Sequence, residues 1–226
     1  KLSQCGKQVI FTLGCRDANK LLIQSHLLGA QVLGLKNVLI LRGDDFSEKQ
    51  LRNVKDVYDF TPTSLIASIK NMNQGMDYRG LQLRTPTNFC VGATMDLGKS
   101  FNEEISLVHR KVLSGADFFV TQPISGPEEV SNFHESYEKH AGKTLSCPIF
   151  WGLQILHPDG INFVDVPTKL KENLSRGRDG GDIAYEQLQK LVDAGVRNIY
   201  VIPPILKGGR RDYDAARRVI QLGKRM

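Results

Sequence analysis

The sequence predicts an α/β fold, and within that class it favours a (β/α)8 TIM barrel. Six short apolar runs have the character of strands, and most are continuous rather than alternating, which is typical of parallel strands covered on both faces. They are Val9 to Leu13, Val38 to Leu41, Phe89 to Ala93, Phe118 to Thr121, Ile149 to Leu153 and Ile199 to Ile202. Helical patterns separate these runs, so the chain repeats a β/α unit.

Three predicted helices share one ending, a glycine at most two positions beyond the last helical residue. The helices cover Asn19 to Leu33, Glu103 to Leu113 and Asp182 to Ala194, and the glycines are Gly34, Gly115 and Gly195. Glycine readily adopts the left-handed conformation of a helix C-cap, and the chain then turns into the next strand. The same join therefore recurs along the chain, as a repeated α/β architecture requires.

Two α/β architectures, a doubly wound sheet and a barrel, differ in the number of β/α units that they require. Six units are compatible with a doubly wound sheet, but no G-x-G-x-x-G motif follows any strand. A barrel needs two further units, roughly 50 to 60 residues at typical barrel length. The chain begins at Lys1 without an initiator methionine, so we expect those two units to precede the sequence shown.

Composition predicts one globular domain over residues 1–226. Hydrophobic residues make up 41% and charged residues 24% of the chain, which is ordinary for a globular protein. No apolar run approaches the roughly 18 to 20 residues of a membrane helix, and no signal peptide opens the chain. The four cysteines form no C-x-x-C pair and no histidine stands at zinc-finger spacing, so no metal site is expected. We expect a reduced, cytoplasmic protein with no membrane partner.

Much of the formal net charge of +6 lies near the C-terminus. The cations there are Lys207, Arg210, Arg211, Arg217, Arg218, Lys224 and Arg225. Aromatic residues do not alternate with them, since Tyr213 alone stands among them, and no recognised nucleic-acid-binding module is present, so nucleic acid is not an expected partner. We predict a solvated helix face instead.

Three stretches show no clear pattern. They are Phe46 to Phe60, Asn71 to Asn88 and His157 to Gly181, and Gly180 and Gly181 are interpreted as loop glycines. The first stretch directly follows a polar strand end. It is therefore either a lid over a site or a disordered loop.

Polar residues follow two strands at their carboxyl ends. Arg42-Gly43-Asp44-Asp45 comes after the second strand, and Thr121-Gln122-Pro123 ends the fourth. Parallel α/β folds bind ligands at this end of the strands, because the loops there vary without disturbing the core. We expect both groups to belong to one active-site rim.

Several segments together resemble the methylenetetrahydrofolate reductase family. They are Cys15 to Asn19, Leu27 to Ala30, Leu41 to Asp44, Phe89 to Ala93, His109 to Val112 and Gly115 to Pro123. The resemblance is closest to the reductase half of fused homocysteine methyltransferase–methylenetetrahydrofolate reductases. The family fold is a (β/α)8 barrel, and this chain resembles its third to eighth units. The family's general-acid glutamate, which lies on the first strand, therefore has no counterpart here.

The resemblance implies a flavin-dependent oxidoreductase of one-carbon metabolism and methionine biosynthesis. Such enzymes reduce 5,10-methylenetetrahydrofolate to 5-methyltetrahydrofolate with NAD(P)H, and FAD is the expected cofactor, with FMN as the alternative. Expected partners besides folate are a second copy of the chain, or a fused or associated methyltransferase or electron-transfer protein. One alternative is a relative with weak or no flavin binding that depends on a partner protein, and another is a non-catalytic folate-binding subunit. A Schiff-base aldolase is disfavoured, because no predicted strand contains a lysine.

The resemblance also implies roles for individual residues. Asp44 is the expected catalytic carboxylate that stabilises the opened iminium, and the structural alternative is that it caps the following helix. Gln122 is the expected catalytic and substrate-binding amide that meets the pterin. The expected cofactor contacts are Leu41, Arg42, Gly43, Asp44, Ala93, Met95, Lys99, Glu104, Arg110 and Lys111. Thr12, Met95 and Lys99 depart from the histidine, tyrosine and histidine of many family members, and the segment after Leu156 is short against the family.

Overall fold

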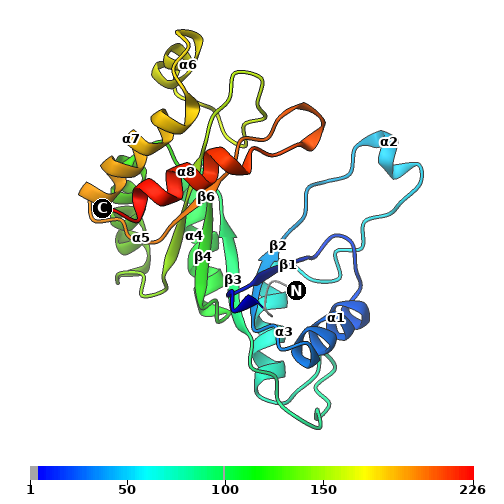
Figure 1. The fold of residues 1–226 in the computed structure, drawn as a ribbon. Coiled ribbons are helices and arrows are strands. Elements are labelled where there is room, and N and C mark those ends of the chain that lie inside the picture. The colour runs from blue at the N-terminus through cyan, green and yellow to red at the C-terminus, as the bar shows by residue number, and fades with distance from the viewer. Residues whose placement is uncertain (1–4, 99) are drawn as a thin grey trace. The chain divides into compact units, whose positions relative to one another are not determined.

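Strands and helices alternate along the chain in the computed structural model, which describes residues 5–98 and 100–226 (Figure 1). The described strands form one six-stranded sheet in the order β1-β2-β3-β4-β5-β6. They are β1 (Ile10–Gly14), β2 (Asn37–Leu41), β3 (Cys90–Met95), β4 (Phe118–Pro123), β5 (Ile149–Gln154) and β6 (Ile199–Ile202). Each agrees with a predicted strand to within one or two residues at either end.

The strand order follows the chain without reversal. β1 pairs in parallel with β2, β2 with β3 and β5 with β6, and the first register places Ile10 opposite Asn37. A doubly wound sheet reverses its order at a switch point, whereas the strands of a barrel follow one another. The predicted α/β class is therefore confirmed, with the sequential parallel sheet of a partial barrel. The count of eight units stays a prediction.

The helices lie between the strands and beyond them. They are α1 (Lys20–Val32), α2 (Glu48–Leu51), α3 (Pro62–Asn73), α4 (Phe101–Leu113), α5 (Pro127–Ala141), α6 (Thr168–Ser175), α7 (Gly180–Asp193) and α8 (Tyr213–Gly223), with a short 3-10 turn η2 (Lys207–Gly209) before the last. The three predicted helices correspond to α1, α4 and α7. Among the described residues, none of the helices combines the length and apolar character needed to cross a membrane.

The chain divides into two compact units. Unit 1 comprises Lys1–Thr94 and Leu107–Phe119, and unit 2 comprises Met95–Ser106 and Val120–Met226. The expected single domain over residues 1–226 stays a prediction.

The core of unit 1 forms where α3 packs on β2. Thr61 caps the helix by accepting from the Ser64 backbone N–H at 3.2 Å, and Pro62 occupies the first turn, where no N–H is needed. The residues that α3 buries are Leu65, Ile66, Ile69 and Met72. Their spacing forms one apolar helix stripe, which fixes the helix against the strands that carry the rim.

The core of unit 2 lies where α7 and α8 pack on each other and on β5 and β6. Its fully or nearly buried residues are Leu153, Ile155, Ala184, Leu188, Ala216 and Val219. The predicted solvated helix face is confirmed for Arg217 and Arg218, which are exposed on α8, whereas Lys207, Arg210 and Arg211 are exposed but precede that helix. The ion pairs of Arg217 and Arg218 lie at the surface.

Helix α7 begins two residues before its predicted start. Asp179 caps it by accepting from the backbone N–H groups of Gly181 at 2.9 Å and Asp182 at 3.1 Å. The interpretation of Gly180 and Gly181 as loop glycines is therefore wrong. A Cβ atom at Gly180 would lie 1.8 Å from the carbonyl oxygen of Leu156, so glycine at this position allows the helix to approach the chain that leaves β5.

Candidate functional site

The chain leaves β2 through a tight turn at Gly43. Gly43 has φ +87°, a conformation that side chains rarely adopt, and a Cβ atom there would lie 2.8 Å from Cβ of Arg16. Arg16 Nη1 donates to the backbone oxygen of Asp44 at 2.6 Å. The Asp44 side chain is exposed, and its carboxylate makes no hydrogen bond within the described part of the chain. The turn thus presents a carboxylate that the fold itself does not use.

The structure excludes the capping alternative for Asp44. The helix that follows, α2, is capped by Ser47, whose backbone N–H donates to Oε1 of Gln50 at 2.9 Å. Because Asp44 precedes the cap by three positions, it has no structural role at this helix.

A second cluster, here called the Tyr58 clasp, consists of Arg42, Asp45 and Tyr58. Asp45 Oδ1 accepts from Arg42 Nη2 at 2.8 Å and from the Tyr58 hydroxyl at 3.1 Å. The Arg42 guanidinium lies 4.9 Å from the centre of the Tyr58 ring. The Tyr58 hydroxyl shares its single proton between Asp45 and the backbone oxygen of Gly43, which lies 3.3 Å away. The clasp joins the two ends of the long excursion that carries α2 (Figure 1).

Backbone strain marks the exit from this excursion. Tyr58 has φ +44°, which is costly for an aromatic residue and persists only where surrounding contacts fix it. The Arg42 guanidinium first, and then the Tyr58 hydroxyl, hold the pKa of the Asp45 carboxyl below its ordinary value. The clasp therefore depends on the ionised form of Asp45.

Acidification is expected to open the Tyr58 clasp. The pKa of Asp45 is lowered in the folded protein, so its stabilisation is complete above the ordinary value and is lost as the pH falls through the folded value. Hydrogen-exchange protection of residues 45–58 should therefore be complete at neutral pH and fall as the pH drops below the ordinary pKa of an aspartate, 3.8. In Asp45→Asn this loss should be absent. Protection that is unchanged in the wild type, or lost equally in both proteins, would contradict the expectation.

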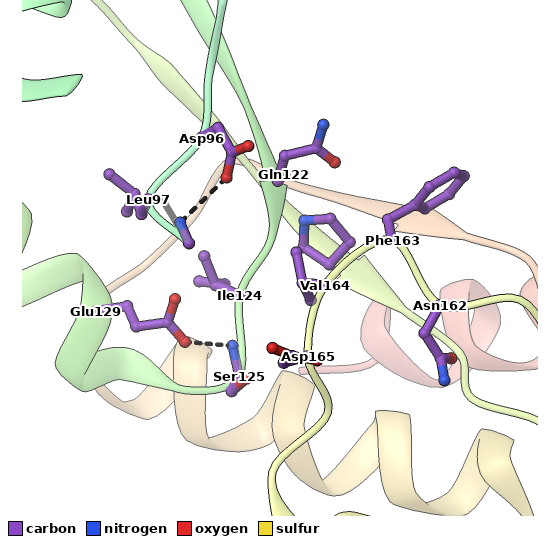
Figure 2. A pocket seen from close by; sticks show the side chains of 12 residues that line it. Asp96, Leu97, Gln122, Ile124, Ser125, Glu129, Asn162, Phe163, Val164 and Asp165 are labelled. Carbon is purple, nitrogen blue, oxygen red and sulfur yellow. Dashed lines mark hydrogen bonds between the residues drawn. The ribbon is translucent and has the colours of Figure 1, made fainter. Parts of the chain in front are cut away.

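A cavity of about 520 Å³ lies in unit 2 beside the end of β4 (Figure 2). Its walls are Asp96, Leu97, Gly98, Gln122, Pro123, Ile124, Ser125, Glu129, Asn162, Phe163, Val164 and Asp165. The Gln122 amide and the Phe163 ring are both exposed, and Phe163 is 51% accessible. An amide and carboxylates beside an aromatic ring suit a planar heterocycle that carries N–H donors on its edge.

The carboxylates of this cavity differ in whether they accept hydrogen bonds from the protein itself. Glu129 accepts from the Ser125 backbone N–H at 2.6 Å, and Asp96 accepts from the Gly98 backbone N–H at 3.1 Å (Figure 2). The exposed Asp165 carboxylate makes no hydrogen bond within the described residues. Asp165 is therefore the wall carboxylate with both oxygens left for a ligand.

A buried glutamine fixes one wall of the cavity. Gln154 ends β5 and is 4% exposed. Its Nε2 donates to the backbone oxygen of Ile161 at 2.7 Å, and its Oε1 accepts from the Phe163 backbone N–H at 3.1 Å. The Ile161 N–H in turn donates to the backbone oxygen of Ile205 at 2.7 Å. Gln154 therefore orients the segment that carries Phe163.

A tyrosine fixes the strand end that carries Gln122. The Tyr200 hydroxyl of β6 donates to the backbone oxygen of Thr121 at 2.5 Å, and Thr121 Oγ1 accepts from the Gly152 N–H at 3.0 Å. A Cβ atom at Gly152 would lie 2.9 Å from the Tyr200 hydroxyl, so the tyrosine passes over a position without a side chain. Burial raises the pKa of Tyr200 to about 12, and the hydroxyl therefore remains a donor at neutral pH.

Comparison with known proteins identifies the family of the chain. A family model described as methylenetetrahydrofolate reductase matches residues 2–203 of the chain. The chain belongs to the methylenetetrahydrofolate reductase family. Membership assigns it a folate-related function, whereas the closer likeness to the fused methyltransferase–reductases stays a prediction.

Two solved structures are similar to the chain at low identity. An uncharacterized protein from Clostridium thermocellum, which binds two copies of 5-methyl-5,6,7,8-tetrahydrofolic acid, is 14% identical, with 100% of this chain and 98% of that chain covered and a TM-score of 0.45. A 4-hydroxy-2-oxoglutarate aldolase/2-deydro-3-deoxyphosphogluconate aldolase from TTHB1 is 14% identical, with 96% and 93% covered and a TM-score of 0.34.

The residues expected to contact a cofactor in this family occupy different environments. Leu41 ends β2 and is half-buried, and Arg42 is exposed beside Gly43. Ala93 and Met95 are 0% and 1% exposed, so protein already covers their side chains. The predicted cofactor contacts of Ala93 and Met95 would therefore have to be made by the backbone rather than by the side chains.

Helix α4 carries the remaining expected contacts. Glu104 is half-buried in its first turn, where a carboxylate complements the helix dipole, and Arg110 is exposed near its end. Lys111 is 4% exposed, and its Nζ donates to the backbone oxygen of Thr94 at 2.6 Å. Lys99 lies outside the described residues. The two cations of the expected Arg110–Lys111 pair thus differ: the Arg110 side chain is exposed, whereas the Lys111 ammonium is bonded to the protein backbone.

The donor set of unit 1 fits a flavin, although not through every expected residue. Arg110 is an exposed guanidinium group of the kind that binds phosphate. Arg42 is also exposed, and although it bonds Asp45 through Nη2 and Gly43 through Nη1, its five N–H donors leave others for a phosphate. Gly43 leaves the backbone uncovered for a flat ring. Lys111 does not fit a phosphate contact in the orientation it adopts, because its ammonium bonds inward to Thr94. The residues that would hold a flavin here are Arg42, Gly43 and Arg110.

Proposed function

We propose that the protein reduces 5,10-methylenetetrahydrofolate to 5-methyltetrahydrofolate with electrons from NAD(P)H. The observation that supports this most strongly is the unit 2 cavity, where an exposed ring, an amide and an unused carboxylate meet in a chain of this family. In the reaction the bond between the methylene carbon and N10 breaks and N10 takes up a proton. A hydride that originates on NAD(P)H forms the new C–H bond, and NAD(P)⁺ is the other product.

The cavity residues would bind the pterin. The Phe163 ring is exposed and offers one face for stacking. The Gln122 amide supplies both a donor and an acceptor, and the Asp165 carboxylate accepts from the amino group and ring N–H of a pterin edge. Gln154 and Tyr200 keep the supporting segments in place, so the cavity is largely formed before a ligand enters.

Asp44 would act on charge that develops during the reaction. When N10 is protonated and its bond to the methylene carbon breaks, the remaining N5 iminium carries a positive charge. A fixed carboxylate lowers the energy of that cation relative to the neutral ground state. Asp44 suits this role because its carboxylate accepts no hydrogen bond from any described group.

A bound flavin would supply hydride relay between the two substrates. Arg42, Gly43 and Arg110 are the residues of this chain that we assign to holding it. The guanidinium groups would neutralise phosphate charge, and the turn at Gly43 would admit the ring close to the backbone.

A visible spectrum of the purified protein tests the proposed function. The protein is expected to be yellow, to bleach when NADH or NADPH is added without oxygen, and to regain its colour when methylenetetrahydrofolate follows. Reoxidation without folate would have to be much slower. A colourless protein that binds folate would overturn the flavin-dependent reaction in favour of a partner-dependent or non-catalytic relative.

Replacing Phe163 by alanine is expected to weaken folate binding. Stacking on an aromatic ring contributes about 1–3 kcal/mol, so the Kd of 5-methyltetrahydrofolate should rise about 5- to 150-fold. Calorimetric titration measures this directly. Tyr213→Ala is the matched control, because Tyr213 is a similarly exposed ring, 65% accessible, that does not line the cavity. Equal Kd values for Phe163→Ala and the wild type would exclude stacking on Phe163.

A further inference from the structure

The rim carboxylate Asp44 is held by an arginine from the neighbouring strand end. Arg16 follows β1, and its Nη1 donates to the Asp44 backbone oxygen at 2.6 Å across 28 positions of sequence. The Arg16 side chain also lies directly against the turn, since a Cβ atom at Gly43 would meet it at 2.8 Å. The only hydrogen bond from this arginine to Asp44 among the described residues is thus to the backbone, and the carboxylate is left unbonded.

The Arg16 guanidinium also contacts Asp17 through its other edge and the Phe46 ring through its face. Nε and Nη2 donate to the two carboxylate oxygens of Asp17 at 2.7 and 3.2 Å. Cζ lies 3.9 Å from the centre of the Phe46 ring, two positions after Asp44. The side chain of Arg16 is only 22% exposed. These contacts fix the direction in which Nη1 points.

Arg16 also holds the exit of the excursion. Its backbone oxygen accepts from the Val57 N–H at 2.8 Å. One residue therefore joins Asp44 and Phe46 at the start of the excursion to Val57 at its end. A lysine would keep the backbone bond to Val57. It cannot reproduce the side-chain contacts, because an ammonium has neither a second edge nor a flat face.

We propose that Arg16 is the positioning residue of Asp44: it fixes the Asp44 peptide and thereby the direction of the carboxylate to which the proposed function assigns stabilisation of the iminium. This inference rests on the proposed function. Displacement of a reacting group by about 1 Å can cost about 100-fold in rate, so loss of the Arg16 contact should act on the chemical step rather than on binding.

Arg16→Lys tests the proposal in the purified holoprotein. The rate of folate-dependent reoxidation is expected to fall about 10- to 100-fold. The rate of reduction by NAD(P)H and the KM for folate should stay within about twofold, because Arg16 is expected to touch neither substrate. Arg217→Lys is the matched control, since Arg217 forms an exposed 2.7 Å ion pair with Asp214 on α8.

A double-mutant cycle separates positioning from general damage. If Arg16 acts through Asp44, Arg16→Lys should have little further effect in an Asp44→Asn background. Rate losses that multiply in the double variant would overturn the proposal. So would an Arg16→Lys protein whose rates for the two half-reactions fall equally.

A readout that needs no turnover completes the test. Hydrogen exchange of residues 44–58 should be faster in Arg16→Lys than in the wild type, while α3 stays unchanged. Unchanged exchange would overturn the proposal even if the rate fell. A wild-type protein without folate-dependent reoxidation would instead refute the proposed function, and the exchange result would then decide only whether Arg16 fixes the turn.

Discussion

Replacing Asp44 by asparagine is expected to slow folate-dependent reoxidation about 100- to 1000-fold, the loss typical of removing one group that stabilises transition-state charge. Reduction by NAD(P)H should remain within about twofold, because no iminium forms in that half-reaction. The amide has nearly the shape of the carboxylate, and no described residue bonds to the Asp44 side chain. Folding should therefore be unaffected, and the thermal unfolding midpoint should not change measurably.

Asp56→Asn is the control for Asp44→Asn. Asp56 is an exposed aspartate of the same excursion, and its carboxylate likewise makes no hydrogen bond within the described residues. Its replacement removes the same charge at a different position. Stopped-flow measurement of each half-reaction compares the two variants. Equal slowing of both half-reactions in Asp44→Asn, or an equal effect of Asp56→Asn, would contradict a role for Asp44 at the iminium.

Replacing Gly180 by alanine is expected to destabilise the protein by about 3 kcal/mol or more, at the upper end of overpacking substitutions. The added methyl group would lie 1.8 Å from the backbone oxygen of Leu156, which cannot rotate away as a side chain can. Either α7 or the chain leaving β5 has to shift. For a chain of this size the unfolding midpoint should fall by about 6 to 12 °C.

Gly29→Ala is the matched substitution for Gly180→Ala. Gly29 lies inside α1, and a Cβ atom there meets nothing within 4 Å. Alanine is the better helix former by up to about 1 kcal/mol, so this variant should be slightly more stable than the wild type. Differential scanning calorimetry measures both proteins. A Gly180→Ala midpoint equal to that of the wild type would show that the approach of α7 to Leu156 can relax without cost.

The strands could be predicted because burial on both faces leaves a direct signature. Runs such as Val38 to Leu41 have no polar alternation to conceal them. Helix α6 could not be found in this way, since it is short, buries no residue and has only Leu170 and Leu174 on its apolar side. Helix α3 does carry signals, namely the Thr61-Pro62 start and a stripe of buried residues, although most of it lies between two stretches interpreted as irregular and no helix is predicted there.

The residues of the candidate site likewise differ in whether a local sequence pattern reveals them. Arg42, Gly43, Asp44 and Gln122 follow strands directly, so local pattern is sufficient to select them. Arg16 and Tyr200 act through contacts that span 28 and 79 positions of sequence, and no local pattern encodes such partners. Gln154 is intermediate, because it ends β5 as Gln122 nearly ends β4, and the strand-end rule could have found it. Phe163 had no signal except its place in a loop after a strand.

The Tyr58 clasp has a consequence for how freely the excursion can change in length. Gly43 and Tyr58 are held together by a hydrogen bond, so the residues between them form a closed loop whose neck is fixed independently of its tip. Doubling the length of a flexible loop costs only about 0.6 kcal/mol once its ends are joined. Insertions or a reporter peptide beside α2, at the far end of the excursion in Figure 1, should therefore leave the Asp44 turn in place. Variation in length can accumulate there without selection against it at the rim.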